Sequence, residues 1–461
     1  MSEQAVFLKG SLLRHITVMS LTSTVGLMAV FLVDFVDMIF IAMLGKAELA
    51  AAIGYAGAIL FFTSSFGIGM AIAAGALVAR ALGEGDEELA RAKATNALIY
   101  GVAFGIVFAA LVWMNLAFLA GLMGATGETL TLAVSYLQII IPSLPFLLVG
   151  MVGGAILRAH GDARRAMMAT VMGGIVNAIL DPILIFGLDL ELTGAAYASV
   201  AARVAMGVAA VIPIVRYYNG FSHPTGAELR KDFAPIAAIA FPAILTQLAT
   251  PIGQAYVTRS MAEFGEAAVA GMAIVSRIMP VAFGVIFALS GAIGPIMGQN
   301  FGAGQQDRVR GAFRDGLIFT AAVVVLVSGI LFLLRPFLAS LFALDGISQT
   351  IVFMFAGPLS LMFFFNGVIF VSNAAFNNLG HPYYSTIINW GRNTVGMIPF
   401  VLLGSMWFGA VGVLVGQFLG GAVFAVIAWV LASKVIAEPK APEDAPFARQ
   451  SRLLQLLHLR R

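Results

Sequence analysis

Long apolar runs dominate this sequence and limit what the chain can fold into. A helix needs about 20 residues to cross a hydrocarbon core of about 30 Å. The sequence contains twelve apolar runs of that order, separated by short polar breaks. They cover residues 12–43, 49–79, 94–120, 129–156, 165–187, 193–216, 233–261, 267–298, 312–341, 348–377, 383–406 and 409–433. Because backbone polar groups inside a bilayer must be satisfied internally, each run is predicted to be a transmembrane helix.

The composition excludes several other classes of protein. Of the 461 residues, 60% are hydrophobic and 11% are charged, which is more apolar surface than a soluble protein can bury. The chain has no cysteine, so it forms no disulfides or thiolate metal sites. The five histidines lie in loops or at helix ends, at positions 15, 160, 223, 381 and 458. We therefore predict an all-α polytopic membrane protein, not an enzyme, with the lipid bilayer as a partner and no metal cofactor or nucleic acid.

The distribution of basic residues predicts the orientation. Twelve spans place both termini on one side of the membrane, and Lys and Arg concentrate in cytoplasmic loops. Of the 26 lysines and arginines, the loops on the opposite side hold only Lys46, Arg259 and Arg335. Three more lie inside spans, namely Arg203, Arg277 and Arg392. We predict a multi-pass protein of the plasma (bacterial inner) membrane with both termini in the cytoplasm.

The two halves of the sequence repeat each other at an offset of about 220 residues. The segments "LGKAELAAA" (44–52), "ALGEGDEELARA" (81–92) and "ILRAHGD" (156–162) match "FGEAAVAGM" (264–272), "NFGAGQQDRVRG" (300–311) and "AFNNLGH" (375–381). Six spans per half is an even number, so the halves share one orientation, which is a transporter architecture. This predicts an N-lobe (1–216), a cytoplasmic linker (217–231), a C-lobe (232–436) and a basic cytoplasmic tail (437–461).

Acidic residues inside the spans mark a candidate ion site. Only Asp34, Asp37 and Asp181 fall well inside a span, and all three belong to the first half. At the repeat offset, Asp34 and Asp37 correspond to the neutral Gln254 and Val257. Since a carboxylate inside a membrane is costly, acids kept in only one half indicate a single functional site there.

Three polar residues are predicted to join these acids in one layer of the first lobe. Asn177 lies one helical turn from Asp181 and on the same face. Tyr136 and Ser199 lie roughly six to eight residues from the ends of their spans, at a depth similar to that of the acids.

Such a layer allows three interpretations. Acids that share a site titrate as a coupled set, which suits a proton carrier. The same carboxylates, with the Asn177 amide, would also ligate a hard cation such as Na+. The third interpretation is structural, with Asp37, Asp181 or Asp34 paired to Arg203, the nearest basic residue in a span of this half.

Residues 10–435 resemble the multidrug and toxic compound extrusion (MATE) transporters. The resemblance rests on "VDMIFIAMLGKAELAAAIG" (36–54), "ILRAHGDARRAM" (156–167), "NAILDPILIFG" (177–187) and "GAAYAS" (194–199). It implies two six-helix lobes, alternating access, and antiport of amphipathic, often cationic drugs and toxic organic compounds against an inward proton or sodium gradient. By motif match, Asp37, Asn177 and Asp181 would form the cation site, Ser199 stands where Thr is common, and Tyr136 lines that lobe.

Two departures from the family pattern bear on mechanism. The first span usually carries a proline near position 22, where this chain has Thr22; the repeat counterpart, Pro242, keeps it. Asp34 stands where a neutral residue is expected, and its role stays open between a second titrating group and a partner for Arg203. The second half lacks the embedded acids that the sodium-coupled branch of the family carries. This difference favours coupling to protons. We expect a multidrug efflux protein that contributes to antibiotic resistance, acts as a monomer and needs no cofactor; the alternatives are sodium-coupled efflux or a lipid-linked precursor flippase.

Overall fold

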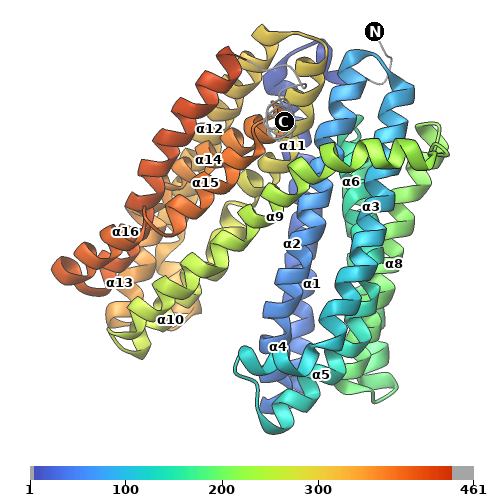
Figure 1. Ribbon diagram of the computed structural model, residues 1–461. Helices are drawn as coiled ribbons and strands as arrows, with labels where there is room; N and C mark the ends of the chain where they lie inside the picture. Colours follow the sequence, from blue (N-terminus) through green and yellow to red (C-terminus); the bar gives the residue numbers. More distant parts are fainter. Residues whose placement is uncertain (1–4, 439–461) are drawn as a thin grey trace, which may run out of the picture. The chain divides into compact units, whose positions relative to one another are not determined.

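A computed structural model describes residues 5–438, and the regular structure in that part of the chain is helical (Figure 1). The first part comprises η1 (Val6–Leu8), α1 (Leu12–Met43), α2 (Ala47–Glu84), α3 (Glu87–Met114), α4 (Leu116–Leu122), α5 (Gly127–Ile140), η2 (Ile141–Ser143), α6 (Leu144–Ala159), α7 (Ala163–Pro182), η3 (Ile183–Gly187) and α8 (Glu191–Tyr217). The second comprises α9 (Gly226–Ala262), α10 (Glu266–Ala282), α11 (Gly284–Gly302), α12 (Gln306–Leu341), α13 (Gly346–Met354), η4 (Phe355–Leu359), α14 (Phe363–Asn378), α15 (Pro382–Asn393) and α16 (Ile398–Ala437).

The helices account for the twelve predicted spans. Within residues 5–438, ten helices are long and apolar enough to cross a membrane, and the bent pair Gly346–Leu359 and Phe363–Asn378 adds an eleventh. The twelfth comes from α16, whose backbone turns at Gly409 (φ 59°, ψ −139°). After this turn the chain runs back on itself, because Gly404 packs directly against the carbonyl group of Gly412. The predicted all-α polytopic fold is confirmed.

The described chain divides into two compact units. Unit 1 contains Leu21–Ile236, and unit 2 combines Phe7–Ser20 with the chain from Ala237 onward. This division differs at both ends from the lobe boundaries expected from the sequence. The expected tail, residues 437–461, lies outside the described residues beyond Glu438.

Hydrogen bonds explain why the units begin and end where they do. The Phe7 backbone amide donates to Gln299 Oε1 across 2.9 Å, and its carbonyl accepts from Asn300 Nδ2 (3.2 Å) and Arg308 Nη2 (2.8 Å). Phe7–Ser20 is therefore held by α11 and α12. The start of α9 is held by α3, because Asp232 forms an ion pair with Lys93 and accepts from Asn96 Nδ2 across 2.7 Å.

Small residues allow the helices of unit 1 to pack closely, as is usual where lipid gives no hydrophobic driving force. A methyl group on Gly173 would lie 3.1 Å from the Ala202 carbonyl oxygen, and one on Gly153 would lie 2.9 Å from the Ala210 side chain. These contacts join α7 and α6 to α8. Together with the cap at Asp162, which accepts from the Arg165 backbone amide across 3.1 Å, they fix the position of α7 in unit 1.

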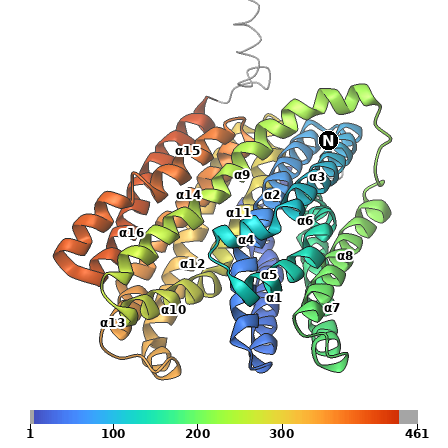
Figure 2. The same ribbon diagram turned by 60° about the horizontal axis from the view of Figure 1, so that its bottom comes forward.

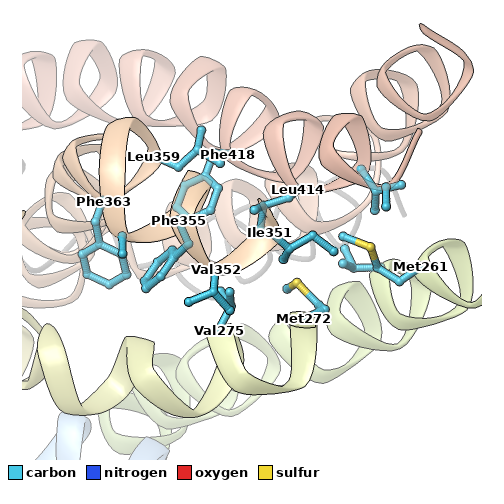
Figure 3. Close-up of a cluster of buried hydrophobic side chains, with 14 of the residues drawn as sticks. Met261, Met272, Val275, Ile351, Val352, Phe355, Leu359, Phe363, Leu414 and Phe418 are labelled. Atoms are coloured by element: carbon cyan, nitrogen blue, oxygen red, sulfur yellow. The ribbon is translucent and has the colours of Figure 1, made fainter. Parts of the chain in front are cut away.

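In unit 2, α14, α15 and α16 pack side by side (Figures 1 and 2). Their core continues into a cluster of buried apolar side chains from α9, α10, α11, α12, α13, η4, α14 and α16. Figure 3 shows Phe355, Leu359, Phe363 and Phe418 within this cluster. The first three flank the bend between α13 and α14, so apolar packing holds that bend on both sides.

Candidate functional site

The C-terminal end of α7 carries the centre of the candidate site. Asn177 and Asp181 lie one turn apart, and their side chains are buried, with Asp181 completely inaccessible. Asn177 Nδ2 donates to Asp181 Oδ2 across 2.6 Å and to Asp37 Oδ1 across 2.9 Å. Asp37 comes from α1 and is half-buried. The structure therefore brings three of the predicted residues together around one side-chain amide.

One glycine in α7 and one in α1 bring the two helices close enough for this contact. A methyl group on Gly174 would lie 3.1 Å from Val33 Cγ2, and one on Gly26 would lie 3.5 Å from the Met167 side chain. Because these positions lack side chains, the two helices approach along their length. The approach ends with Asp37 opposite Asn177.

The helix changes its geometry immediately after Asp181. Pro182 lacks a backbone N–H, and the following residues form the π-helical turn η3, in which Leu188 N donates to the Ile183 carbonyl across 2.9 Å. Gly194 at the start of α8 packs against this turn, where an added methyl would lie 2.7 Å from Leu184 C. Single π-turns often occur at functional sites. Here the turn and α8 fix the end of the helix that carries Asp181.

One carboxylate oxygen in the site has no donor. Asp181 Oδ1 is buried and accepts no hydrogen bond from the residues that the structure describes. Asp37 and Asp181 lie close to each other, because both accept from the same Asn177 nitrogen. An unsatisfied buried oxygen costs about 1–3 kcal/mol, so a donor to Oδ1 would stabilise the site.

A second polar group lies between this cluster and Arg203. Tyr136 of α5 is buried, and its hydroxyl lies near the Ser199 side chain on α8 and within electrostatic range of both aspartates. Arg203 acts on it too, one turn beyond Ser199. Tyr136 and Ser199 thus border the aspartates without joining the Asn177 hydrogen bonds in the described structure.

Arg203 does not form the ion pair considered as a structural alternative. Its Nη1 donates to the Ile140 carbonyl across 3.1 Å and to Ser143 Oγ across 3.0 Å. Both acceptors lie where α5 passes through η2 into α6, so Arg203 satisfies the backbone of a broken span. Among residues 5–438, the ion pairs do not include Arg203, Asp37 or Asp181. The sequence pattern did not single out Ser143, although Ile-Pro-Ser inside an apolar run signals such a break.

Asp34 takes a different position from Asp37. It lies on an exposed part of α1, and in the described part of the chain it forms no ion pair with Arg203. The charge of Asp37, one turn away, nevertheless acts on Asp34. Asp34 is therefore a neighbour of the site and not part of its hydrogen-bonded core.

Comparison with known proteins places this architecture in a family. The MatE family model matches residues 23–183 and 242–403. The two matches begin about 220 residues apart, which agrees with the offset read from the sequence. Together they cover more than half of the chain.

Relatives along nearly the whole chain support the same placement. A FAD transporter of Shewanella oneidensis is 29% identical over 437 residues, covering 92% of this chain and 95% of that protein. The multidrug export protein MepA of Staphylococcus aureus is 24% identical over 403 residues, covering 86% and 88%. A mutant of the Vibrio cholerae MATE transporter VcmN superposes with a TM-score of 0.88 at 23% identity, covering 93% and 98%. The chain is a multi-pass membrane transporter and belongs to the MatE family.

Proposed function

We propose that the protein is a secondary active exporter that couples inward proton movement to outward movement of amphipathic organic compounds, organic cations among them. Asp37, Asn177 and Asp181 form the coupling site, and Tyr136 and Ser199 border it. The ion gradient supplies the energy, so no cofactor is required. The monomer works by alternating access in the bacterial inner membrane, with both termini in the cytoplasm.

The proposal rests on the Asp181 oxygen that accepts no hydrogen bond from the described residues. Asp181 Oδ1 is buried without a hydrogen bond among the described residues, while Asn177 already occupies Oδ2. A proton held between the two adjacent carboxyl groups supplies the missing donor, because a protonated carboxyl donates while a carboxylate only accepts. Two buried acids close together hold one proton more readily than they hold two negative charges.

The orientation of Asn177 favours a proton over Na+. Its Nδ2 group directs N–H bonds at both Asp37 and Asp181. A hard cation between these carboxylates would need oxygen ligands, and the amide presents its donor there instead. Sodium binding would require the amide to turn over and both hydrogen bonds to break.

The relatives support a substrate class of ring-bearing organic molecules. One carries the name of a FAD transporter and another that of a multidrug export protein. We propose that this protein exports organic compounds comparable in size to FAD and to drug molecules. Drug resistance of the cell would follow from this export.

The test is efflux from substrate-loaded proteoliposomes under an imposed pH gradient or an imposed sodium gradient. Wild-type efflux should follow the pH gradient, and Asp37→Asn and Asp181→Asn should abolish that response. Asp307→Asn is the matched control, because its side chain is 98% exposed at the start of α12. Efflux that follows sodium alone, or that survives both substitutions at the site, would refute proton coupling through these residues.

A further inference from the structure

A ladder of polar side chains joins α14 and α15 inside unit 2. Ser385 Oγ donates to Asn377 Oδ1 across 3.2 Å, and Asn389 Nδ2 donates to Asn373 Oδ1 across 3.3 Å. The third rung joins Arg392 Nη1 to Asn366 Oδ1 across 2.6 Å. Successive rungs use positions three, four or seven residues apart on each helix, so they lie along facing stripes of two antiparallel helices.

The rungs differ in burial and in charge. Ser385, Asn389 and Asn377 are 1%, 3% and 7% exposed, so the first rung is closed, while Asn373 of the second rung is half-buried. Arg392 and Asn366 are both half-buried. The charged rung is thus partly accessible, and it is the one that offers a positive charge to a ligand.

The charged rung lies where two neighbouring spans are interrupted. Asn366 is in the first turn of α14, after a 60° bend that follows Gly357 and Pro358. Arg392 is in the last turn of α15, before the helix breaks at Thr394 (φ −125°, ψ −93°). It stands ten residues from the start of α15, or about 15 Å into the span at 1.5 Å per residue. Interrupted helices near the middle of the membrane are where transporters bind substrates.

Arg392 has unused donors and no counter-charge. A guanidinium group has five N–H donors, and one hydrogen bond from Arg392 is found in the described residues, the one to Asn366. The ion pairs of residues 5–438 do not include Arg392. A cation held in a membrane span without a carboxylate partner is costly and marks a functional group. The N-terminal end of α14, beside Asn366, adds further positive potential.

We propose that Arg392 and Asn366 bind the phosphate group of an organic substrate, with the remaining guanidinium N–H groups and the Asn366 amide as donors. Arginine suits this role because its planar fork matches phosphate oxygens. The inference rests on the proposed export function and adds its substrate class: the acids of unit 1 hold the proton, and the arginine of unit 2 recognises an anion. The chemistry of an anionic lipid headgroup is the same, so the experiment separates the two sources.

The experiment measures binding in detergent without any gradient. Flavin fluorescence compares the wild-type affinity for FMN with that for riboflavin, which has the same ring and lacks the phosphate. We expect FMN to bind at least about tenfold more tightly, as one charge-assisted bidentate contact would give. Arg392→Gln should lower FMN affinity to the riboflavin level. Arg277→Gln, at an exposed position on α10 of the same unit, should leave both affinities unchanged.

The Asn366→Asp variant distinguishes a ligand-binding role of Arg392 and Asn366 from a purely structural role. The new carboxylate keeps the acceptor for Arg392 and neutralises its charge, so the melting temperature should stay at or above the wild-type value. The preference for FMN over riboflavin should nevertheless disappear. A wild-type protein that binds both flavins equally, or an Asn366→Asp variant that keeps the preference, would overturn the proposal.

Two further arms identify the source and isolate the coupling. If phosphatidylglycerol displaces FMN from the wild type, the site takes lipid headgroups; if it does not, the site takes soluble phosphate compounds. In the first case, Arg392→Gln should remove the FMN binding that phosphatidylglycerol displaces. In the second case, Arg392→Gln should still lower FMN affinity to the riboflavin level. FMN binding is measured without a gradient and efflux with one, so failure of phosphate recognition and failure of proton coupling are distinguishable.

Discussion

Asn177 donates to Asp181 across 2.6 Å from one turn earlier on the same helix, and the same amide nitrogen reaches Asp37 of α1. One side chain therefore holds together two carboxyl groups from helices that are distant in the sequence. The amide is buried, so water does not compete for these bonds.

Replacement of Asn177 by Leu, which has a similar shape, removes both hydrogen bonds and leaves the acids without this donor. We expect the free energy of unfolding to fall by about 1–3 kcal/mol, seen as a lower melting temperature in detergent, together with loss of pH-driven efflux. Asn115→Leu is the control, since Asn115 is exposed and its side chain donates to the Leu111 carbonyl four residues earlier. Wild-type efflux from Asn177→Leu would show that the amide does not organise the site.

Gly194 provides a test of the π-turn that follows Asp181. A methyl group there would lie 2.7 Å from Leu184 C and 2.8 Å from its carbonyl oxygen, both backbone atoms. Gly194→Ala must push η3 away from α8, at a cost of about 1–3 kcal/mol, and move Asp181 with it. We expect slower pH-driven efflux and a lower melting temperature. Gly121→Ala, which meets open space inside α4, should change neither; equal effects of the two substitutions would argue against a role for the turn.

The loop after α6 makes a prediction about stability and pH. His160 is 8% exposed, its ring lies 4.3 Å from that of Tyr218, and its Nδ1 lies 2.9 Å from the Ile156 carbonyl oxygen. Burial lowers the pKa of His160 from its usual 6.5, and the Ile156 carbonyl and the charges of Glu87 and Asp162 offset this only in part. The folded state therefore prefers neutral His160, so its contribution is present above pH 6.5 and is lost as the pH falls through the lowered pKa.

The wild-type melting temperature should accordingly fall more steeply below about pH 6.5 than that of His160→Asn, whose amide still donates to the Ile156 carbonyl. Thermal unfolding in detergent across this range provides the measurement. Parallel pH profiles for the two proteins would mean that His160 is not the acid-sensitive group.

The absence of cysteine from the sequence allows a clean test of orientation. Lys46 and Arg310 have side chains that are 55% and 63% exposed, and the proposed topology puts them on opposite sides of the membrane. In intact cells, an impermeant maleimide should label Lys46→Cys and leave Arg310→Cys unlabelled until the membrane is permeabilised. Their surface ion pairs contribute little to stability, so both variants should fold. The reverse labelling pattern would place the termini outside.

Much of the fold could be predicted because each span is specified by its own sequence. The first predicted span, 12–43, coincides with α1, and the gap between 406 and 409 falls at the Gly409 turn. The unit boundary was harder to predict, because it depends on long-range bonds such as those from Phe7 to Asn300 and Arg308. No sequence pattern within the first span predicts that its first residues pack with unit 2.

The candidate site shows the same limit. Spacing along one helix predicted that Asn177 and Asp181 share a face, and the depth estimate placed Asp37 at their level. The contacts of Arg203 with Ile140 and Ser143 depend on a break in the helix and on the rotation of α8, which periodicity does not encode. The ladder between α14 and α15 was missed for a related reason. The sequence places Arg392 inside a span, but its contact with Asn366 depends on how the two helices face each other.

A measurement of proton flux tests directly whether Asp37 and Asp181 carry the coupling proton. A pH-sensitive dye on the side that receives protons should report a flux that begins when substrate is added to proteoliposomes, at matched sodium on both sides. We expect this flux for the wild type and for Asp307→Asn, and no such flux for Asp37→Asn and Asp181→Asn. Substrate-dependent proton flux that persists in Asp181→Asn would contradict this expectation.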